Sequence, residues 1–259
     1  MKTPITYYGG KQRLLKYILP LIPKHTLYAE PFTGGGAVFF EKEPSDIEVI
    51  NDTNKALVTF YKVAQSNFRK LRKRVQETLH SRISHKKAQL VYANPEFFSE
   101  VDVAWSVWML ASTSFASMLG APFGYDKSKQ TTTRKFNNKK KDFTKELQQR
   151  LEHAQIESRD ACEIISSRDT KQSFFYCDPP YFNADMGHYK GYTQQDFERL
   201  LQTLSKVKGK FLLSSYPSDI LNKYSKQNGW HTKSIKQLHK IGSNNSKTKT
   251  EVLTANYQI

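Results

Sequence analysis

Cysteine is nearly absent from this chain of 259 residues. Its two cysteines, Cys162 and Cys177, lack the spacing of a metal site and stand beside apolar residues, so we expect core thiols and no disulfide framework. No apolar run approaches the roughly 18 residues of a membrane-spanning helix. The segment after Met1 also lacks the apolar stretch of a signal peptide. These absences predict a cytoplasmic protein with no membrane partner.

Acidic residues are few relative to basic ones. The chain has 24 Asp and Glu against 40 Lys and Arg, which gives a net charge of +16 and a pI of about 9.6. Such a surplus predicts a polyanionic partner, because each neutralised phosphate releases a counterion. The basic residues cluster at 69–74 and 139–141, and we expect nucleic acid to be that partner.

The first quarter of the sequence alternates between strand and helix patterns. An apolar run at 27–30 leads into the glycines 34–36, and 37–40 begins a helix. A second run at 47–50 ends close to Asp52. This layout is typical of a doubly wound α/β half that binds a nucleotide, with an acid for the ribose hydroxyls. No Lys-Ser or Lys-Thr pair follows the glycines, so a nucleoside ligand without phosphates is favoured.

Helical patterns dominate the middle of the chain. The apolar spacing predicts helices over 57–79 and 101–119, the second with core tryptophans, and an earlier helix from Lys11 to Leu19. The polar and basic residues up to Asn138 predict a mobile loop within an insertion. Strand patterns return at 154–158, 174–177, 211–215, 235–238 and 251–257, of which the last two predict an antiparallel hairpin at a sheet edge, and Thr193 predicts a helix cap.

Asp178-Pro179-Pro180-Tyr181 is the most informative stretch of the sequence. It places a carboxylate at the end of the strand 174–177, followed by two prolines that stop strand and helix alike and by an aromatic ring. A carboxylate can accept hydrogen bonds from an amino group while the ring stacks on the base that carries it. The tetrapeptide therefore indicates alkylation of an exocyclic amine of a nucleobase, although a surface turn is the alternative.

Three motifs in order resemble the Dam-like (class alpha) family of adenine-N6 DNA methyltransferases. They are Tyr7-Tyr8-Gly9-Gly10-Lys11, the loop 32–36 and the tetrapeptide 178–181. The resemblance implies a doubly wound S-adenosylmethionine-dependent methyltransferase fold with a mixed seven-stranded sheet. It also implies a catalytic domain of residues 1–56 and 145–259, and a mainly helical target-recognition insertion of residues 57–144.

The resemblance implies roles for individual residues. Asp178 and the Pro179 carbonyl would accept hydrogen bonds from the target amine, and Tyr181 would stack on an adenine flipped out of duplex DNA. The loop 183–192, with Gly187 and Gly191, would close over the site. The methyl donor would be S-adenosylmethionine, without a metal. Its implied contacts are Tyr7 and Lys11 at the methionine end, Glu30, Phe32, Gly34 and Gly36 around the pocket, Asp52 at the ribose, Asp160 near the adenine, and Asp178. Pro180 completes the implied catalytic motif. The predicted DNA contacts are Arg134, Lys135, Asn137 and Lys139.

The resemblance is weakest at residues 114–125, where only Pro122-Phe123-Gly124 matches the family's GATC-reading segment. Recognition of GATC therefore does not follow. A cytosine-N4 methyltransferase remains an alternative, although such enzymes more often have Ser in place of Asp178. Methylation of protein glutamine and non-catalytic DNA binding are further alternatives. The expected partners are double-stranded DNA and a cognate restriction endonuclease that need not bind the chain, which we expect to be a monomer.

Overall fold

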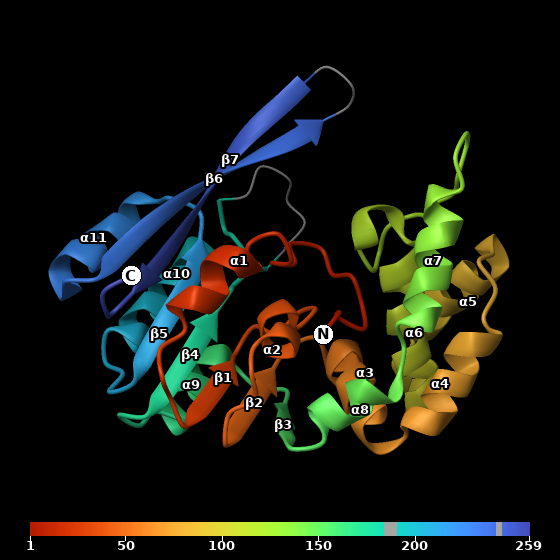
Figure 1. Ribbon diagram of the computed structural model, residues 1–259, viewed down its shortest axis with the longest axis horizontal. Helices are drawn as coiled ribbons and strands as arrows, with labels where there is room; N and C mark the ends of the chain where they lie inside the picture. Colours follow the sequence, from red (N-terminus) through yellow and green to blue (C-terminus); the bar gives the residue numbers. More distant parts are fainter. Residues whose placement is uncertain (184–190, 242–244) are drawn as a thin grey trace. The chain divides into compact units, whose positions relative to one another are not determined.

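The computed structural model describes residues 1–183, 191–241 and 245–259. Its described strands form one seven-stranded mixed sheet in the order β3-β2-β1-β4-β5-β7-β6 (Figure 1). Strand β1 pairs in parallel with β2 and β4, and β4 pairs in parallel with β5, whereas β7 is antiparallel to both β5 and β6. The strands span Leu27–Glu30 (β1), Ile47–Asn51 (β2), Ala154–Glu157 (β3), Ser173–Cys177 (β4), Lys210–Ser215 (β5), His231–Ile241 (β6) and Asn245–Ala255 (β7).

The chain packs as two compact units. Unit 1 comprises Met1–Lys16, Thr33–Glu43 and Asp52–Ser158, and unit 2 comprises Tyr17–Phe32, Pro44–Asn51 and Arg159–Ile259. The predicted catalytic domain and target-recognition insertion are defined by function, whereas these two units are defined by packing. That division therefore stays a prediction, but the mainly helical character expected of residues 57–144 is confirmed.

One face of the sheet in unit 2 is covered by three helices: α9 (Ala161–Ser167), α10 (Gln194–Leu204) and α11 (Asp219–Asn228). Alternate strand residues such as Ala29, Phe175 and Leu213 enter a buried cluster with Phe197 and Leu201 of α10. Side chains of a strand alternate between its two faces, so the intervening residues point the other way. Thr193 caps α10 through a capping box with Asp196, which confirms the predicted cap.

The other face of the sheet in unit 2 carries aromatic side chains. Tyr28 of β1 and Phe174 of β4 lie 6.1 Å apart, measured between ring centroids, and His25 packs against both. The Tyr257 ring packs against Phe174, and its hydroxyl donates to the carbonyl of Leu21 at 2.8 Å. This aromatic layer fixes the strands whose ends carry the predicted catalytic residues.

Unit 1 is built around helix α6 (Glu100–Thr113), which is buried along most of its length, including Trp105 and Trp108 as predicted. Phe136 and Phe143 pack against the Trp108 ring. Continuous apolar composition, rather than a single apolar stripe, is typical of such a central helix. Helices of unit 1 that contact α6 are α3 (Lys55–Ser66), α4 (Phe68–Glu77), α5 (Arg82–Ala93) and α7 (Thr131–Lys141), and α8 (Lys145–Leu151) contacts α3.

The predicted basic loop is wrong from Thr131 onward, because residues 131–138 belong to helix α7, whereas residues 120–130 form no helix. Only Phe136 of α7 is buried, so the sequence shows almost no apolar periodicity there. The start of the helix is fixed by Asp126, whose carboxylate accepts from the backbone nitrogens of Thr132 at 2.8 Å and Thr133 at 3.1 Å. These bonds lower the pKa of Asp126 to about 2, as expected for an acid at a helix N-terminus.

Three other helix predictions need shorter bounds. The helix expected from Lys11 begins only at Leu15 (α1, Leu15–Ile18), because backbone turns close at residues 7–10 and 11–14. A 3-10 helix, η1 (Leu19–Leu21), then includes Pro20, which is tolerated in a first turn. The helix predicted over 57–79 is broken at Asn67, whose backbone is not helical, and that predicted over 101–119 ends at Thr113.

The strand predictions at 27–30, 47–50, 154–158, 174–177 and 211–215 are confirmed within a residue or so. The predicted C-terminal hairpin is also confirmed, with β6 at the edge and longer strands than expected. Cys177 is buried as predicted, whereas Cys162 is half-buried. Among the described residues, no helix is long and apolar enough to cross a membrane.

Candidate active site

Polar side chains line one face of the sheet in unit 2, at the carboxyl ends of its parallel strands. Glu30 is the last residue of β1, Asp178 follows β4, and Ser214 lies near the end of β5. The register pairs β1 with β4 and β4 with β5, so these ends lie side by side. Ligand sites of open α/β sheets form at this edge, as the sequence predicted for Glu30 and Asp178.

Tyr181 links this row of polar groups. Its hydroxyl lies 3.2 Å from Asp178 Oδ1 and 3.2 Å from Ser214 Oγ, and it donates to Oε1 of Glu251. Ser214 Oγ also donates to Glu251 Oε1, at 3.0 Å. Glu251 comes from β7 and is only 8% exposed. The tetrapeptide 178–181 is therefore held by side chains from β5 and β7, two strands that lie far from it in the sequence.

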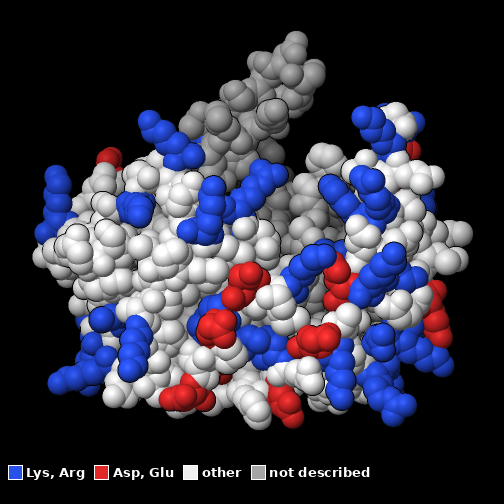
Figure 2. All heavy atoms as spheres, in the orientation of Figure 1, with Lys and Arg blue, Asp and Glu red and all other residues white. Residues whose placement is uncertain are grey.

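Three carboxylates act on one buried tyrosine of β4. Burial raises the pKa of Tyr176 well above its usual value, and Asp178, Glu30 and Glu251 raise it further by charge. Glu30 is itself 2% exposed and accepts from the Tyr28 hydroxyl at 2.7 Å. The acidic residues at this edge contrast with the net positive charge of the whole chain. Lys and Arg side chains are spread over the face shown in Figure 2. Such an edge suits a cationic ligand group.

A second tyrosine supports the first. The rings of Tyr181 and Tyr216 lie 4.4 Å apart between centroids, and Lys249 of β7 donates to the Tyr216 hydroxyl at 3.2 Å. Lys249 and Glu251 are two residues apart on β7 and so face the same side. Each of them binds one ring of this tyrosine pair.

In unit 1, the glycine loop packs against Tyr7. Gly34 and Gly36 adopt positive φ angles of 49° and 66°, a region that side chains disfavour. A Cβ atom on Gly35 would lie 2.8 Å from the Cβ of Tyr7. The loop is anchored further by the Tyr61 hydroxyl, which donates to the Gly34 carbonyl at 2.7 Å. The three glycines are thus needed for backbone shape and for close packing.

Asp52 lies beside this loop in unit 1. Its carboxylate accepts from the backbone nitrogens of Gly34 and Asn54, both at 2.9 Å. Burial raises the pKa of Asp52, and these backbone bonds offset part of that rise. Burial also raises the pKa of Tyr7, with Asp52 adding to the effect. The predicted cofactor residues Tyr7, Gly34 and Asp52 are therefore brought together.

Helix α5 also reaches this group. The side chain of Asn54 donates to the Tyr92 hydroxyl at 3.0 Å, and burial raises the pKa of Tyr92, with a smaller contribution from Asp52.

Tyr92, Ser214 and Glu251 were not among the residues that the sequence predicted for the site. The one available signal was Glu251, an acid at the start of an alternating apolar strand.

The remaining predicted cofactor residues lie at well-defined positions. Lys11 is 8% exposed and donates to the carbonyl of Gly9 at 3.0 Å. Phe32 packs on the core of unit 2, edge to face with Tyr192. Asp160 caps α9 and pairs with Arg199 at 2.6 Å. Partial burial raises the pKa of Asp160, but the bond and charge of Arg199, together with the backbone nitrogens of Glu163 and Cys162, outweigh it, so the pKa is lowered.

Asn51, the last residue of β2, connects two backbone segments of unit 2, one after β1 and one after β3. Its side-chain nitrogen donates to the carbonyls of Pro31 at 2.9 Å and Arg159 at 3.0 Å. Its side-chain oxygen accepts from the Arg159 backbone nitrogen at 2.9 Å. One amide thus satisfies three backbone groups and fixes the chain immediately before Asp52 and Asp160.

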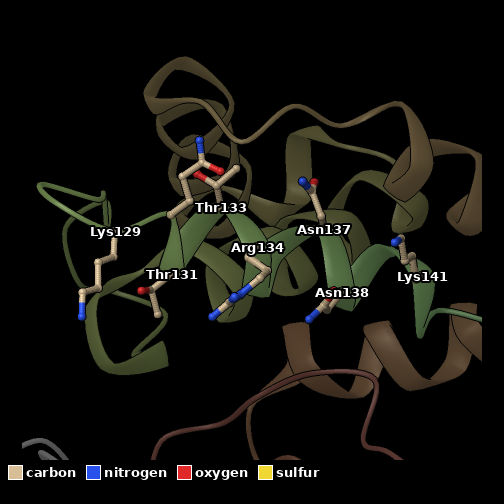
Figure 3. A pocket seen from close by; sticks show the side chains of 8 residues that line it. Lys129, Thr131, Thr133, Arg134, Asn137, Asn138 and Lys141 are labelled. Carbon is tan, nitrogen blue, oxygen red and sulfur yellow. The ribbon is translucent and has the colours of Figure 1, made fainter.

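Helix α7 lines a pocket of about 540 Å³ in unit 1 (Figure 3). Three predicted DNA contacts, Arg134, Lys135 and Asn137, are exposed on helix α7. Lys139 is half-buried and donates to the Thr3 carbonyl at 3.0 Å. Burial lowers the pKa of Lys139. Side chains lining the pocket are Lys129, Gln130, Thr131, Thr133, Arg134, Asn137, Asn138 and Lys141.

Two expectations stay open. Most of the predicted closing loop, residues 184–190 with Gly187, lies outside the described residues. In the part of the chain that the structure describes, no group of three or more His, Cys, Asp or Glu side chains is arranged to hold a metal ion. The absence of a metal from the reaction stays a prediction.

Comparison with known proteins extends over nearly the whole chain. It is 26% identical to the Type II methyltransferase M1.LlaDCHI of Lactococcus lactis subsp. cremoris, across 96% of this chain and 93% of the relative. It is 25% identical to the Type II methyltransferase M.MjaIII of Methanocaldococcus jannaschii, across 99% of each. Residues 7–251 match one family description, and this range includes the glycine loop, Asp52 and the tetrapeptide at 178–181. The chain belongs to the family of D12 class N6 adenine-specific DNA methyltransferases.

Proposed function

We propose that Asp178, the Pro179 carbonyl and Tyr181 carry out site-specific methylation of an adenine that is flipped out of duplex DNA. The observation that carries this proposal is the row of polar groups at the strand ends of unit 2, where Asp178 follows β4 and the Tyr181 hydroxyl lies 3.2 Å from its Oδ1. Family membership gives N6 of adenine as the methylated atom and implies S-adenosylmethionine as the methyl donor. The alternatives of cytosine N4, protein glutamine and non-catalytic binding are therefore not favoured.

The chemistry asked of the protein is to make a poor nucleophile react. The adenine amine is weakly nucleophilic because its lone pair is delocalised into the ring. Asp178 and the Pro179 carbonyl would each accept a hydrogen bond from this amine, which favours a pyramidal nitrogen with its lone pair free to attack. The Tyr181 ring would stack on the flipped base and orient it. Positioning and fixed charge thus supply most of the acceleration.

When bound, S-adenosylmethionine supplies a methyl group on a positively charged sulfur, which leaves as a neutral thioether. The nitrogen–carbon bond forms as the sulfur–carbon bond breaks, and the additional proton on N6 is lost to solvent. The carboxylates Glu30 and Asp178 and the aromatic Phe32 suit the positive charge of the donor. Pro180 holds the backbone of the motif between Asp178 and Tyr181.

The donor-binding residues of unit 1 fit the rest of such a ligand. Asp52 is an acceptor for ribose hydroxyls, and the glycines 34–36 let the backbone come close to a ligand. Tyr7 and Lys11 are proposed at the methionine end, and Asp160 near the adenine. Asp160 belongs to unit 2, where Arg199 donates to both of its carboxylate oxygens, at 3.1 Å to Oδ1 and 2.6 Å to Oδ2.

We assign contacts to DNA to helix α7 and the residues around it. Arg134, Lys135 and Asn137 are exposed on α7. Lys129 and Lys141 line the pocket beside this helix, together with Arg134 and Asn137 (Figure 3). Arg and Lys reach phosphates, and Arg and Asn can also bind base edges. Lys139 is a weaker candidate than its neighbours, because its ammonium group binds Thr3. These residues support the assignment of 57–144 as the target-recognition insertion.

The biological setting follows from the relatives' names. Both are Type II methyltransferases, which supports a role in restriction-modification, with a cognate endonuclease that need not bind this chain. We propose that the chain acts as a monomer on DNA in the cytoplasm of a bacterial or phage-infected cell.

Mass spectrometry of nucleosides tests the proposed function. Purified protein is incubated with S-adenosylmethionine and several duplex DNAs, and the digested nucleosides are analysed. N6-methyladenine is the expected product. N4-methylcytosine, or no methylated base despite measured binding of the donor, would contradict the proposal.

A further inference from the structure

The contacts around Tyr181 involve more oxygen atoms than protons. Its hydroxyl lies near Asp178, Glu251 and Ser214, and Ser214 also contacts Glu251. Tyr181 and Ser214 each contribute one hydroxyl proton to this set. Each hydroxyl can donate to one acceptor at a time. Tyr181 therefore cannot serve both carboxylates together.

The geometry directs both protons toward Glu251. The distance from the Tyr181 oxygen to Asp178 Oδ1 is 3.2 Å, beyond the usual O–H···O range of about 2.5–3.0 Å. Ser214 donates to Glu251 Oε1 at 3.0 Å, and Tyr181 donates to the same oxygen. Glu251 is buried, and a buried carboxylate requires such donors. The Tyr181 proton therefore goes to Glu251 rather than to Asp178.

We propose that Glu251 is a positioning residue for methyl transfer, acting through Tyr181. By accepting the Tyr181 proton, Glu251 prevents that proton from occupying Oδ1 of Asp178, the acceptor assigned to the adenine amine. The same bond holds the Tyr181 ring at a fixed angle for stacking. This inference rests on the proposed function of Asp178 and Tyr181. It adds a residue about 70 positions further along the chain, on a strand outside the catalytic motif.

Replacing Glu251 by Gln tests the proposal, because the neutral amide is a weaker acceptor of similar size. Tyr181 is then expected to donate to Asp178, the remaining carboxylate. We expect Glu251→Gln to lower kcat by about 10- to 100-fold, with the KM for S-adenosylmethionine within about threefold of wild type. Glu48→Gln is the matched control, because Glu48 is another buried glutamate of unit 2, bound to the Ser45 backbone nitrogen. It should leave kcat unchanged.

A double-mutant cycle separates positioning from a merely structural role. In the Tyr181→Phe background the proton is gone, so adding Glu251→Gln should change kcat by less than about twofold. An equal loss in both backgrounds, or wild-type kcat in Glu251→Gln, would overturn the proposal. If circular dichroism shows that Glu251→Gln is unfolded, Glu251→Asp replaces it. The shorter carboxylate should also lower kcat, and a wild-type rate would again overturn the proposal.

The wild-type enzyme is assayed first for N6-methyladenine. Absence of that product would refute the proposed function. Its presence, combined with an unaffected Glu251→Gln variant, would refute only the role of Glu251.

Discussion

The predicted donor-binding residues of unit 1 and the predicted catalytic residues of unit 2 are held in different ways. In unit 1, Asp52 is bound by backbone nitrogens close to it in the fold, from Gly34 and Asn54. In unit 2, Tyr181 is bound by side chains, from Ser214 of β5 and Glu251 of β7. Only a substitution to proline removes a backbone donor, whereas any side-chain partner can be removed by replacing its residue. The predicted donor-binding residues should therefore respond to changes of loop shape, and the predicted catalytic residues to changes of single side chains.

The largest effect is expected at Asp178. Because Asp178→Ala removes a charged acceptor for the target amine, we expect the rate of methyl transfer to fall by about 1000-fold or more. Binding of S-adenosylmethionine, measured by calorimetry, and of DNA should persist. Asp219→Ala, at an exposed position in the first turn of α11, is the control in the same unit. Retained transfer by Asp178→Ala would refute the assignment.

Loop shape is tested at Gly35. The added methyl group of Gly35→Ala would collide with Tyr7, at 2.8 Å between Cβ atoms, so we expect binding of S-adenosylmethionine to weaken by about 1–3 kcal/mol. Gly120→Ala is the matched control, since a Cβ atom there meets nothing within 4 Å. Calorimetric titration with the donor measures both variants. Equal affinities would show that the glycine loop does not shape the donor site.

Asp52 should make donor binding depend on pH. Its pKa is raised above 3.8 by burial, so affinity for S-adenosylmethionine should fall on acidification at a pH above 3.8, as the carboxylate is protonated. A raised carboxyl pKa makes the opposite contribution to folding: it stabilises at low pH, and this is lost as pH rises through the folded pKa. Protonation of Asp52 therefore does not unfold the protein at low pH, and unfolding caused by Asp52 cannot explain the loss of affinity. Asp52→Asn should bind about tenfold more weakly and lack this pH dependence, and an identical profile would contradict the assignment.

The smallest expected effect concerns helix α7, which should influence neither donor binding nor the chemical step. Arg134→Ala should weaken DNA binding and reduce the slope of log K against log salt by about one if Arg134 contacts one phosphate. The rate at saturating DNA should not change. Lys62→Ala, an exposed cation of α3 in the same unit and outside the basic clusters, is the control. Fluorescence anisotropy over a salt series measures both, and identical slopes would exclude a phosphate contact by Arg134.

The sequence predicted the sheet well, because its buried strands are short apolar runs bounded by turn residues, as at 174–177 and 211–215. It also predicted which residues follow strand ends, including Asp52 and Asp178. Helix α7 was missed because only Phe136 of its residues is buried and its start depends on an acid several residues earlier. The Tyr181–Glu251 contact could not be predicted, since strand order, and not sequence distance, brings these two residues together.

The order of the last strands has a consequence for synthesis of the protein. In space β7 lies between β5 and β6, but in the chain it follows β6. As the polypeptide leaves the ribosome, β6 emerges before the only described strand to which it pairs. Glu251 arrives with β7, after the tetrapeptide that it binds. The tetrapeptide 178–181 is thus translated before the strand that completes its contacts, so a nascent chain would form the Tyr181–Glu251 contact only after β7 has docked.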